Sequence, residues 1–168
     1  MKSLKNKKIA ILGTSPIMIL LYFRLKKKNF VDVFEHLKIG GAWRLDQYQN
    51  KYFSPHNNVI VPLKKNEEKY INPINSELEN FGCKIIKPKG NYQLLTHYKP
   101  QNIYIHDLSN LFIQFKKKCN SLKKKKITNV KVSLDNVYLN EKKYDHVFFP
   151  TCFDINKIII NKSIFRIK

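Results

Sequence analysis

The sequence predicts an α/β fold, in which helices cover a parallel sheet and a small antiparallel β-meander is attached. Near the start of the chain, a short apolar run at residues 7–12 leads through the turn residues Gly-Thr-Ser into a longer apolar stretch. A second short apolar run, at residues 29–36, ends near an acidic residue. Beyond residue 126, short runs alternate between apolar and polar residues. Short apolar runs are typical of strands buried in a parallel sheet, and alternation is typical of strands with one exposed face.

The first stretch, KKIAILGTSPIMILLYFRLKKK, predicts a strand, a turn and a helix. Pro16 stands at the first helical turn, where its missing N–H costs nothing because that group has no helical partner. The lysines at residues 26–28 complement the dipole at the end of this helix. The next run, NFVDVFEH, predicts a second strand that ends at Glu35. Together these elements form a strand–helix–strand unit with both strands parallel.

A signal peptide or an N-terminal membrane anchor is the competing interpretation of this stretch, because a basic leader precedes an apolar run. No small-residue cleavage site follows the run, and Gly13, Ser15 and Pro16 interrupt it. The run is also shorter than the roughly 20 residues that a spanning helix needs. We therefore expect no membrane segment, and an anchored protein remains the weaker alternative.

The spacing within this unit is typical of a Rossmann-like nucleotide-binding fold. Glu35 lies 22 residues after Gly13, close to the offset of the acid that accepts hydrogen bonds from a ribose. The glycine turn opens the helix, whose free N–H groups carry partial positive charge and attract a pyrophosphate. The pattern thus predicts a dinucleotide-binding site.

The rest of the chain predicts shorter elements. Residues 45–71 read as loop with one short strand at residues 58–62. A helix from Asn72 or Ser76 to Gly82 precedes a strand at residues 83–87. An amphipathic helix over residues 106–122 presents apolar residues at helical spacing. Three short strands then follow, and the last of them is YDHVFF.

The segment KKIAILGTSPIMILLYFRLKKKNFVDVFEHLKIGGAWR resembles the N-terminal FAD-binding stretch of two-dinucleotide-type flavoproteins. This family includes flavin amine oxidases, protoporphyrinogen oxidases, phytoene desaturases and flavin monooxygenases. The resemblance covers about the first 45 residues and rests on the first strand, Glu35 and IGGAWR. Of the glycines that the family places at positions 13, 15 and 18, this chain keeps Gly13 and has Ser15 and Met18 instead.

The resemblance implies that FAD is the cofactor, with NAD(P) as the weaker alternative. It also implies that the strand YDHVFF returns to the parallel sheet. It implies a lineage of flavin-dependent oxidoreductases, and His56 is a further candidate for the flavin side. The residues expected to contact the cofactor are Gly13, Ser15, Pro16, Ile17, Glu35, His36, Gly40, Gly41, Ala42, Trp43, Arg44 and Val132.

The charge balance offers a second functional interpretation. The chain has 32 basic and 12 acidic residues and a net charge of +20, so that polyanions are attracted to it. The lysine runs at residues 116–118 and 123–126 favour a non-catalytic module that binds nucleic acid or an acidic partner. Because no nucleic-acid-binding motif accompanies them, we expect solvated helix ends there instead, and no nucleic-acid partner.

We expect residues 1–168 to be one FAD/NAD(P)-binding domain, incomplete at its C-terminus, with a loop-rich insertion within residues 38–120. A second chain or a missing C-terminal domain would then complete it. Its three cysteines are far apart, which indicates a reducing, cytoplasmic setting and no metal site. The sequence contains no recognisable catalytic constellation, so whether the chain is an enzyme, and on which substrate, stays open.

Overall fold

The computed structural model describes residues 4–44, 46–48, 51–53, 59–60, 68–87, 103–133, 136–150, 157–160 and 163–165. The chain groups into two compact units, one formed by Met1–Ala42 with Cys119–Lys168 and the other by Trp43–Lys118. The second unit falls inside residues 38–120, where the sequence led us to expect an insertion. That the whole chain is one domain, incomplete at its C-terminus, stays a prediction.

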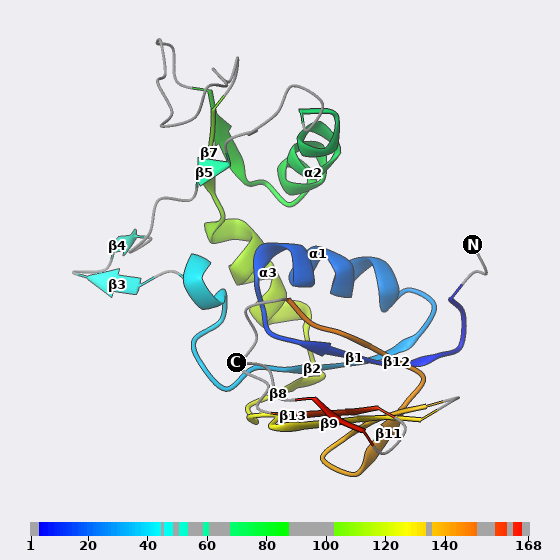
Figure 1. Ribbon diagram of the computed structural model, residues 1–168. Helices are drawn as coiled ribbons and strands as arrows, with labels where there is room; N and C mark the ends of the chain where they lie inside the picture. Colours follow the sequence, from blue (N-terminus) through cyan, green and yellow to red (C-terminus); the bar gives the residue numbers. More distant parts are fainter. Residues whose placement is uncertain are drawn as a thin grey trace, which may run out of the picture. The chain divides into compact units, whose positions relative to one another are not determined.

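A four-stranded parallel sheet forms the centre of the first unit (Figure 1). Its strands run in the order β12-β1-β2-β8 and all pair in parallel. If these four strands are numbered 1 to 4 along the chain and read from β8 to β12, their order is 3-2-1-4. This is the order of the first four strands of a Rossmann fold. The strands are β1 (Lys8–Leu12), β2 (Phe30–Phe34), β8 (Leu122–Lys123) and β12 (His146–Phe148), and helix α1 (Pro16–Leu25) connects β1 to β2.

A five-stranded sheet packs on one face of the parallel sheet, and α1 lies on the opposite face (Figure 1). Its order is β11-β10-β9-β13-β14, antiparallel except where β13 pairs in parallel with β9. The strands are β9 (Asn129–Val132), β10 (Val137–Leu139), β11 (Lys142–Tyr144), β13 (Lys157–Ile160) and β14 (Ser163–Phe165). The predicted class, a Rossmann-like α/β fold with a small antiparallel meander, is therefore confirmed.

Alternation along the strands explains the two layers. In β1, Ala10 and Leu12 pack with Val130, Leu139 and Tyr144 of the antiparallel sheet. Successive side chains of a strand point to opposite faces, so the equally buried Ile9 and Ile11 face the α1 side. A strand buried on both faces has no polar position, which is why residues 9–12 are all apolar and the lysine of β1, Lys8, stands at its exposed start.

Within the described residues, the second unit holds the α-helices α2 and α3 and short antiparallel strands. Strands β3 (Asp46–Tyr48) and β4 (Lys51–Phe53) pair with each other. A second sheet consists of the strands β5, β7 and β6, in that order. The 3-10 helix η1 (Gly41–Trp43) lies where the chain passes from the first unit to the second. The remaining elements are β5 (Val59–Ile60), α2 (Glu68–Asn80), β6 (Lys84–Ile86), β7 (Tyr104–Asp107) and α3 (Ser109–Lys118).

The structure corrects three expectations about these elements. Helix α2 begins at Glu68 and carries Pro73 inside it, although the sequence predicted a start at Asn72 or Ser76. Tyr104–Asp107 is a strand, which shortens the predicted helix over residues 106–122 to α3. The lysine run at residues 123–126 does not end a helix, because Lys123 belongs to β8 and pairs with Phe34.

None of the helices in the described parts of the chain combines the length and the apolarity that crossing a bilayer requires.

Candidate functional site

The four parallel strands end at one edge of their sheet, here called the carboxyl edge. Residues Gly13–Ile17 follow β1 there, Glu35–Gly41 follow β2, Lys124 and Lys125 follow β8, and Phe149 follows β12. In open α/β sheets, ligands bind outside this edge where the strand order reverses. That point lies between β1 and β12. From β1 the chain adds β2 and β8 on one side, and it then returns to add β12 on the other side.

The turn at Gly13 connects β1 to α1 in a conformation that favours glycine. Gly13 has a φ of 86°, which residues with a Cβ adopt only at a cost. Its N–H donates to the carbonyl oxygen of Phe34 at 2.7 Å. This bond fixes the turn directly beside the end of β2.

The N-terminus of α1 faces the carboxyl edge without a negative side chain of its own. Ser15 is the N-cap, its side chain makes no capping hydrogen bond within the described residues, and Pro16 occupies the first turn. The first turn contains no acidic residue, and Ile17 is 48% exposed. The first N–H groups of a helix have no intrahelical partner, so this end suits an anion such as a phosphate.

Glu35 lies at the same edge, and its carboxylate is bound by the chain itself. Its Oε2 accepts hydrogen bonds from the Thr14 N–H at 3.1 Å and from the Thr14 hydroxyl at 2.8 Å. Its Oε1 accepts from the Leu37 N–H at 2.9 Å and lies 3.9 Å from His36 Nδ1. Glu35 is 3% exposed and Thr14 is 1% exposed, so these bonds hold a buried carboxylate.

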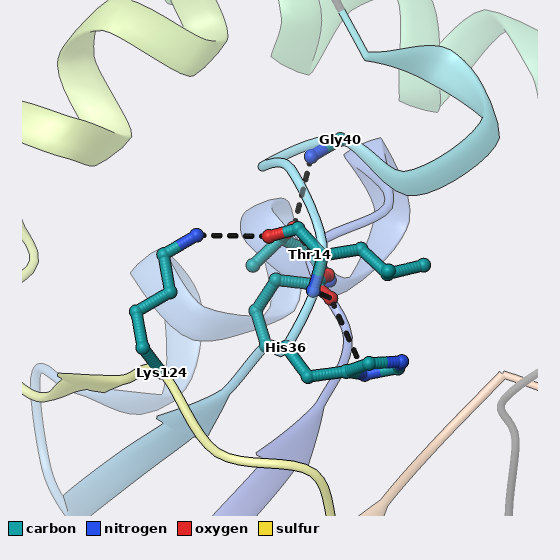
Figure 2. A network of polar contacts seen from close by, with 6 residues as sticks. Thr14, His36, Gly40 and Lys124 are labelled. Carbon is teal, nitrogen blue, oxygen red and sulfur yellow. Dashed lines mark hydrogen bonds and ion pairs between the residues drawn. The ribbon is translucent and has the colours of Figure 1, made fainter.

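Thr14 also links this carboxylate to the glycine pair. Its Oγ1 accepts a hydrogen bond from the Gly40 N–H at 2.9 Å, as Figure 2 shows. Gly40 and Gly41 have φ angles of 100° and 57°, so that both stand in conformations that favour glycine. Thr14 thereby ties the turn after β1 to the loop after β2.

Lys124, which follows the neighbouring strand β8, also contacts the loop after β2. Its Nζ donates to the carbonyl oxygen of Leu37 at 2.8 Å (Figure 2). The loop after β2 therefore has fixed contacts at both ends, with Thr14 at Gly40 and with Lys124 at Leu37.

The edge can accept two kinds of ligand group. The helix N-terminus suits a phosphate, and the carboxylate can accept a hydroxyl. A carboxylate has about four acceptor positions, and donors from the part of the chain that the structure describes fill three of them at Glu35. The residues therefore fit a dinucleotide, with one acceptor position left for its ribose.

The structure brings most of the predicted cofactor residues to this edge. They are Gly13, Ser15, Pro16, Ile17, Glu35, His36, Gly40 and Gly41. Met18, which replaces a family glycine, is half-buried on α1. Their contact with a cofactor stays a prediction.

The other predicted residues lie elsewhere or have no described side chain. Trp43 and Arg44 group with the second unit, where Arg44 Nε lies 3.5 Å from Asp46 Oδ2. Val132 packs against the core between the two sheets of the first unit. The Ala42 side chain and His56 lie outside what the structure describes. Their roles also stay predictions.

Sequence reasoning did not single out Thr14 or Lys124. A hydroxyl residue directly after the glycine of a dinucleotide turn is the signal that could have pointed to Thr14. No local signal distinguishes Lys124 from its neighbours in the run at residues 123–126, because its position follows from the pairing of β8 with β2.

No protein-family model and no curated protein matches this sequence. Among solved structures, a putrescine oxidase bound to putrescine is similar with a TM-score of 0.56 and 8% identity over 84% of this chain. A CLA-producing fatty acid isomerase from P. acnes is similar with a TM-score of 0.58 and 11% identity over 88% of this chain. The matches span 57% and 59% of those two chains. At these identities the similarity establishes the fold.

Proposed function

We propose that this chain is the dinucleotide-binding domain of a flavoprotein of the two-dinucleotide type, and that FAD is its cofactor. One observation carries the proposal: the N-terminus of α1, the Gly13 turn and Glu35 lie together at the carboxyl edge. This is the edge at which the strand order reverses, between β1 and β12. The similarity of the N-terminal segment to flavin amine oxidases and the fold shared with a putrescine oxidase support it.

In this proposal the pyrophosphate lies against the first turn of α1. Gly13 lets the backbone approach it, and the N–H groups of the first turn, which contains no acidic residue, bind it. The remaining acceptor position on Glu35 takes one hydroxyl of the adenosine ribose. Gly40 and Gly41 have no side chains, so that the loop after β2 leaves room for the cofactor.

The flavin ring would supply oxidation–reduction chemistry, as it does throughout the family that the sequence resembles. The residues described here bind and orient the cofactor. The matched region spans little more than half of the two similar proteins. Neither similar structure supports the alternative of a nucleic-acid-binding module.

The test is a titration of the purified full chain with FAD. We expect a yellow protein with absorption near 450 nm, or quenching of flavin fluorescence on addition of FAD. The variant Gly13→Ala should bind FAD at least about tenfold more weakly, because a Cβ at this φ strains the turn that presents the helix end.

Gly82→Ala is the matched control. Gly82 has a similar φ of 74° but lies in the second unit, so this variant should carry comparable strain and bind FAD as the unmodified chain does. A colourless protein that does not bind FAD at any accessible concentration contradicts the proposal.

A further inference from the structure

We infer that the ribose position at the carboxyl edge accepts an adenosine whose ribose carries a phosphate at its 2′ position. The inference rests on the proposed function, since it concerns the same site. Thr14 determines this specificity because it donates two hydrogen bonds to the Glu35 carboxylate. Without these bonds, the carboxylate would exclude a 2′-phosphate.

An acid at the end of the second strand ordinarily selects an unmodified ribose. It accepts hydrogen bonds from ribose hydroxyls, and its negative charge repels a phosphate placed on the same sugar. Both effects need a carboxylate with free lone pairs that faces the ligand.

The Glu35 carboxylate meets this condition only at one acceptor position. Both acceptor positions of Oε2 are taken by Thr14, and one of Oε1 by Leu37. At most one hydroxyl can then bind, so that a second ribose oxygen is free to carry another group. Three hydrogen bonds also spread the negative charge of the carboxylate toward their donors.

Positive groups surround the same place. The pairing of Phe34 with Lys123 and the bond from the Glu35 N–H to the Lys123 carbonyl at 3.0 Å set the end of β8 beside Glu35. The next two residues, Lys124 and Lys125, are exposed there, and Lys38 is exposed in the loop after β2.

Lys124 is the best placed of these cations. Its Nζ is held 2.8 Å from the Leu37 carbonyl, and an ammonium group has three donors. It can therefore keep this bond and still donate to a phosphate. Lys123 is different, because its Nζ lies 2.6 Å from Asp32 Oδ2 on the sheet.

The experiment measures binding of two ligand pairs to the full chain by calorimetry. The pairs are 2′,5′-ADP against 5′-AMP and NADP⁺ against NAD⁺, and the members of each pair differ only in the 2′-phosphate. We expect the phosphorylated member to bind equally or up to about tenfold more tightly at low salt, with the advantage falling as salt screens the lysines. A 2′-phosphate that weakens binding tenfold or more overturns the inference.

Substitutions at Lys124 and Thr14 test the two parts of the argument. Lys124→Gln should reduce the preference for the 2′-phosphate about fivefold, whereas Lys117→Gln, an exposed lysine on α3, should leave it unchanged. Thr14→Val removes the hydroxyl hydrogen bond and so frees one more acceptor position on Glu35, which should shift the ratio at least fivefold toward the unphosphorylated ligand. Thr14→Ser should keep the original ratio. The ratio within one variant cancels a general loss of affinity or stability.

The outcomes separate this inference from the proposed function. Binding of FAD together with rejection of both phosphorylated ligands overturns the inference alone. Failure of FAD and all four adenine nucleotides to bind overturns both. Equal ratios in Thr14→Val and the unmodified chain refute the role of Thr14.

Discussion

Asp32 connects the two sheets of the first unit. It lies on β2 opposite Ala10, on the face that meets the antiparallel sheet. Its Oδ2 accepts a hydrogen bond from the Tyr144 hydroxyl at 2.6 Å and lies 2.6 Å and 2.9 Å from the Nζ atoms of Lys123 and Lys142. A charge on this face is tolerated because three donors from two other strands satisfy it.

These contacts determine how Asp32 titrates. Burial by itself raises the pKa of the carboxyl, but the hydrogen bonds from Lys123, Tyr144 and Lys142 outweigh it and lower the pKa from 3.8 to about 2. A carboxyl with a lowered pKa stabilises the folded state above its unfolded pKa. This contribution is therefore complete above about pH 4 and is lost as the pH falls toward 2.

We predict that Asp32→Asn lowers the free energy of unfolding at neutral pH by about 1 to 2 kcal/mol, a range that allows for solvent screening of the partly exposed lysines. The variant should also lose less stability than the unmodified chain between pH 4 and pH 2. Chemical denaturation at a series of pH values measures both. Glu79→Gln, at an exposed acid of α2, is the control, and an equal acid dependence in Asp32→Asn and the unmodified chain would contradict the prediction.

At the scale of elements, the hairpin between β10 and β11 turns on two residues, Asn140 and Glu141. Their φ angles are 42° and 75°, and Leu139 pairs with Lys142 on either side. Two positive φ angles in a two-residue loop are typical of a type I′ turn, whose twist matches that of the strands. Asparagine tolerates the first position, whereas glutamate is strained at the second.

Glu141→Gly should therefore stabilise the chain by about 0.5 to 1 kcal/mol, because glycine adopts the positive φ without steric cost and Asn-Gly is a favoured type I′ pair. Thermal and urea unfolding measure the change. Glu141→Ala removes the same charge but keeps the Cβ, so it should give no comparable gain. A loss of stability in Glu141→Gly would show that the larger chain entropy of glycine outweighs the relief of strain.

At the scale of the whole molecule, the excess of positive charge opposes compactness. A net charge of +20 on 168 residues produces self-repulsion between surface lysines. Salt shortens the range of this repulsion to about 10 Å at 0.1 M. The folded chain should thus gain stability when salt is added.

We predict that the melting temperature rises by about 3 to 6 °C between roughly 20 mM and 300 mM sodium chloride, which corresponds to about 1 to 2 kcal/mol for a chain of this size. Differential scanning calorimetry measures the shift. Replacing Lys27, Lys28, Lys116 and Lys117, all exposed, with glutamine should reduce it. A melting temperature that stays constant or falls with salt would contradict self-repulsion as the dominant effect.

Local signals determined the beginning of the fold. The predicted strand at residues 7–12, the helix from Pro16 and the strand at residues 29–36 correspond to β1, α1 and β2. Apolar runs, a glycine turn and a proline at the helix start act over a few neighbouring residues, so they can be recognised without knowledge of the rest of the chain. The return of residues 146–148 to the parallel sheet was predicted from the resemblance to flavoproteins, because a local apolar run does not indicate which strand it pairs with.

Only the tertiary structure decided what surrounds Glu35. The sequence placed an acid at the right distance from Gly13, but it did not indicate that Thr14 would bind both acceptor positions of one carboxylate oxygen and also hold Gly40. Nor did it indicate that the two-residue strand β8 would bring Lys124 to Leu37. A strand's own residues determine that it is buried, whereas a hydrogen bond between residues 21 or 87 positions apart exists only once the sheet has set its strand order and register.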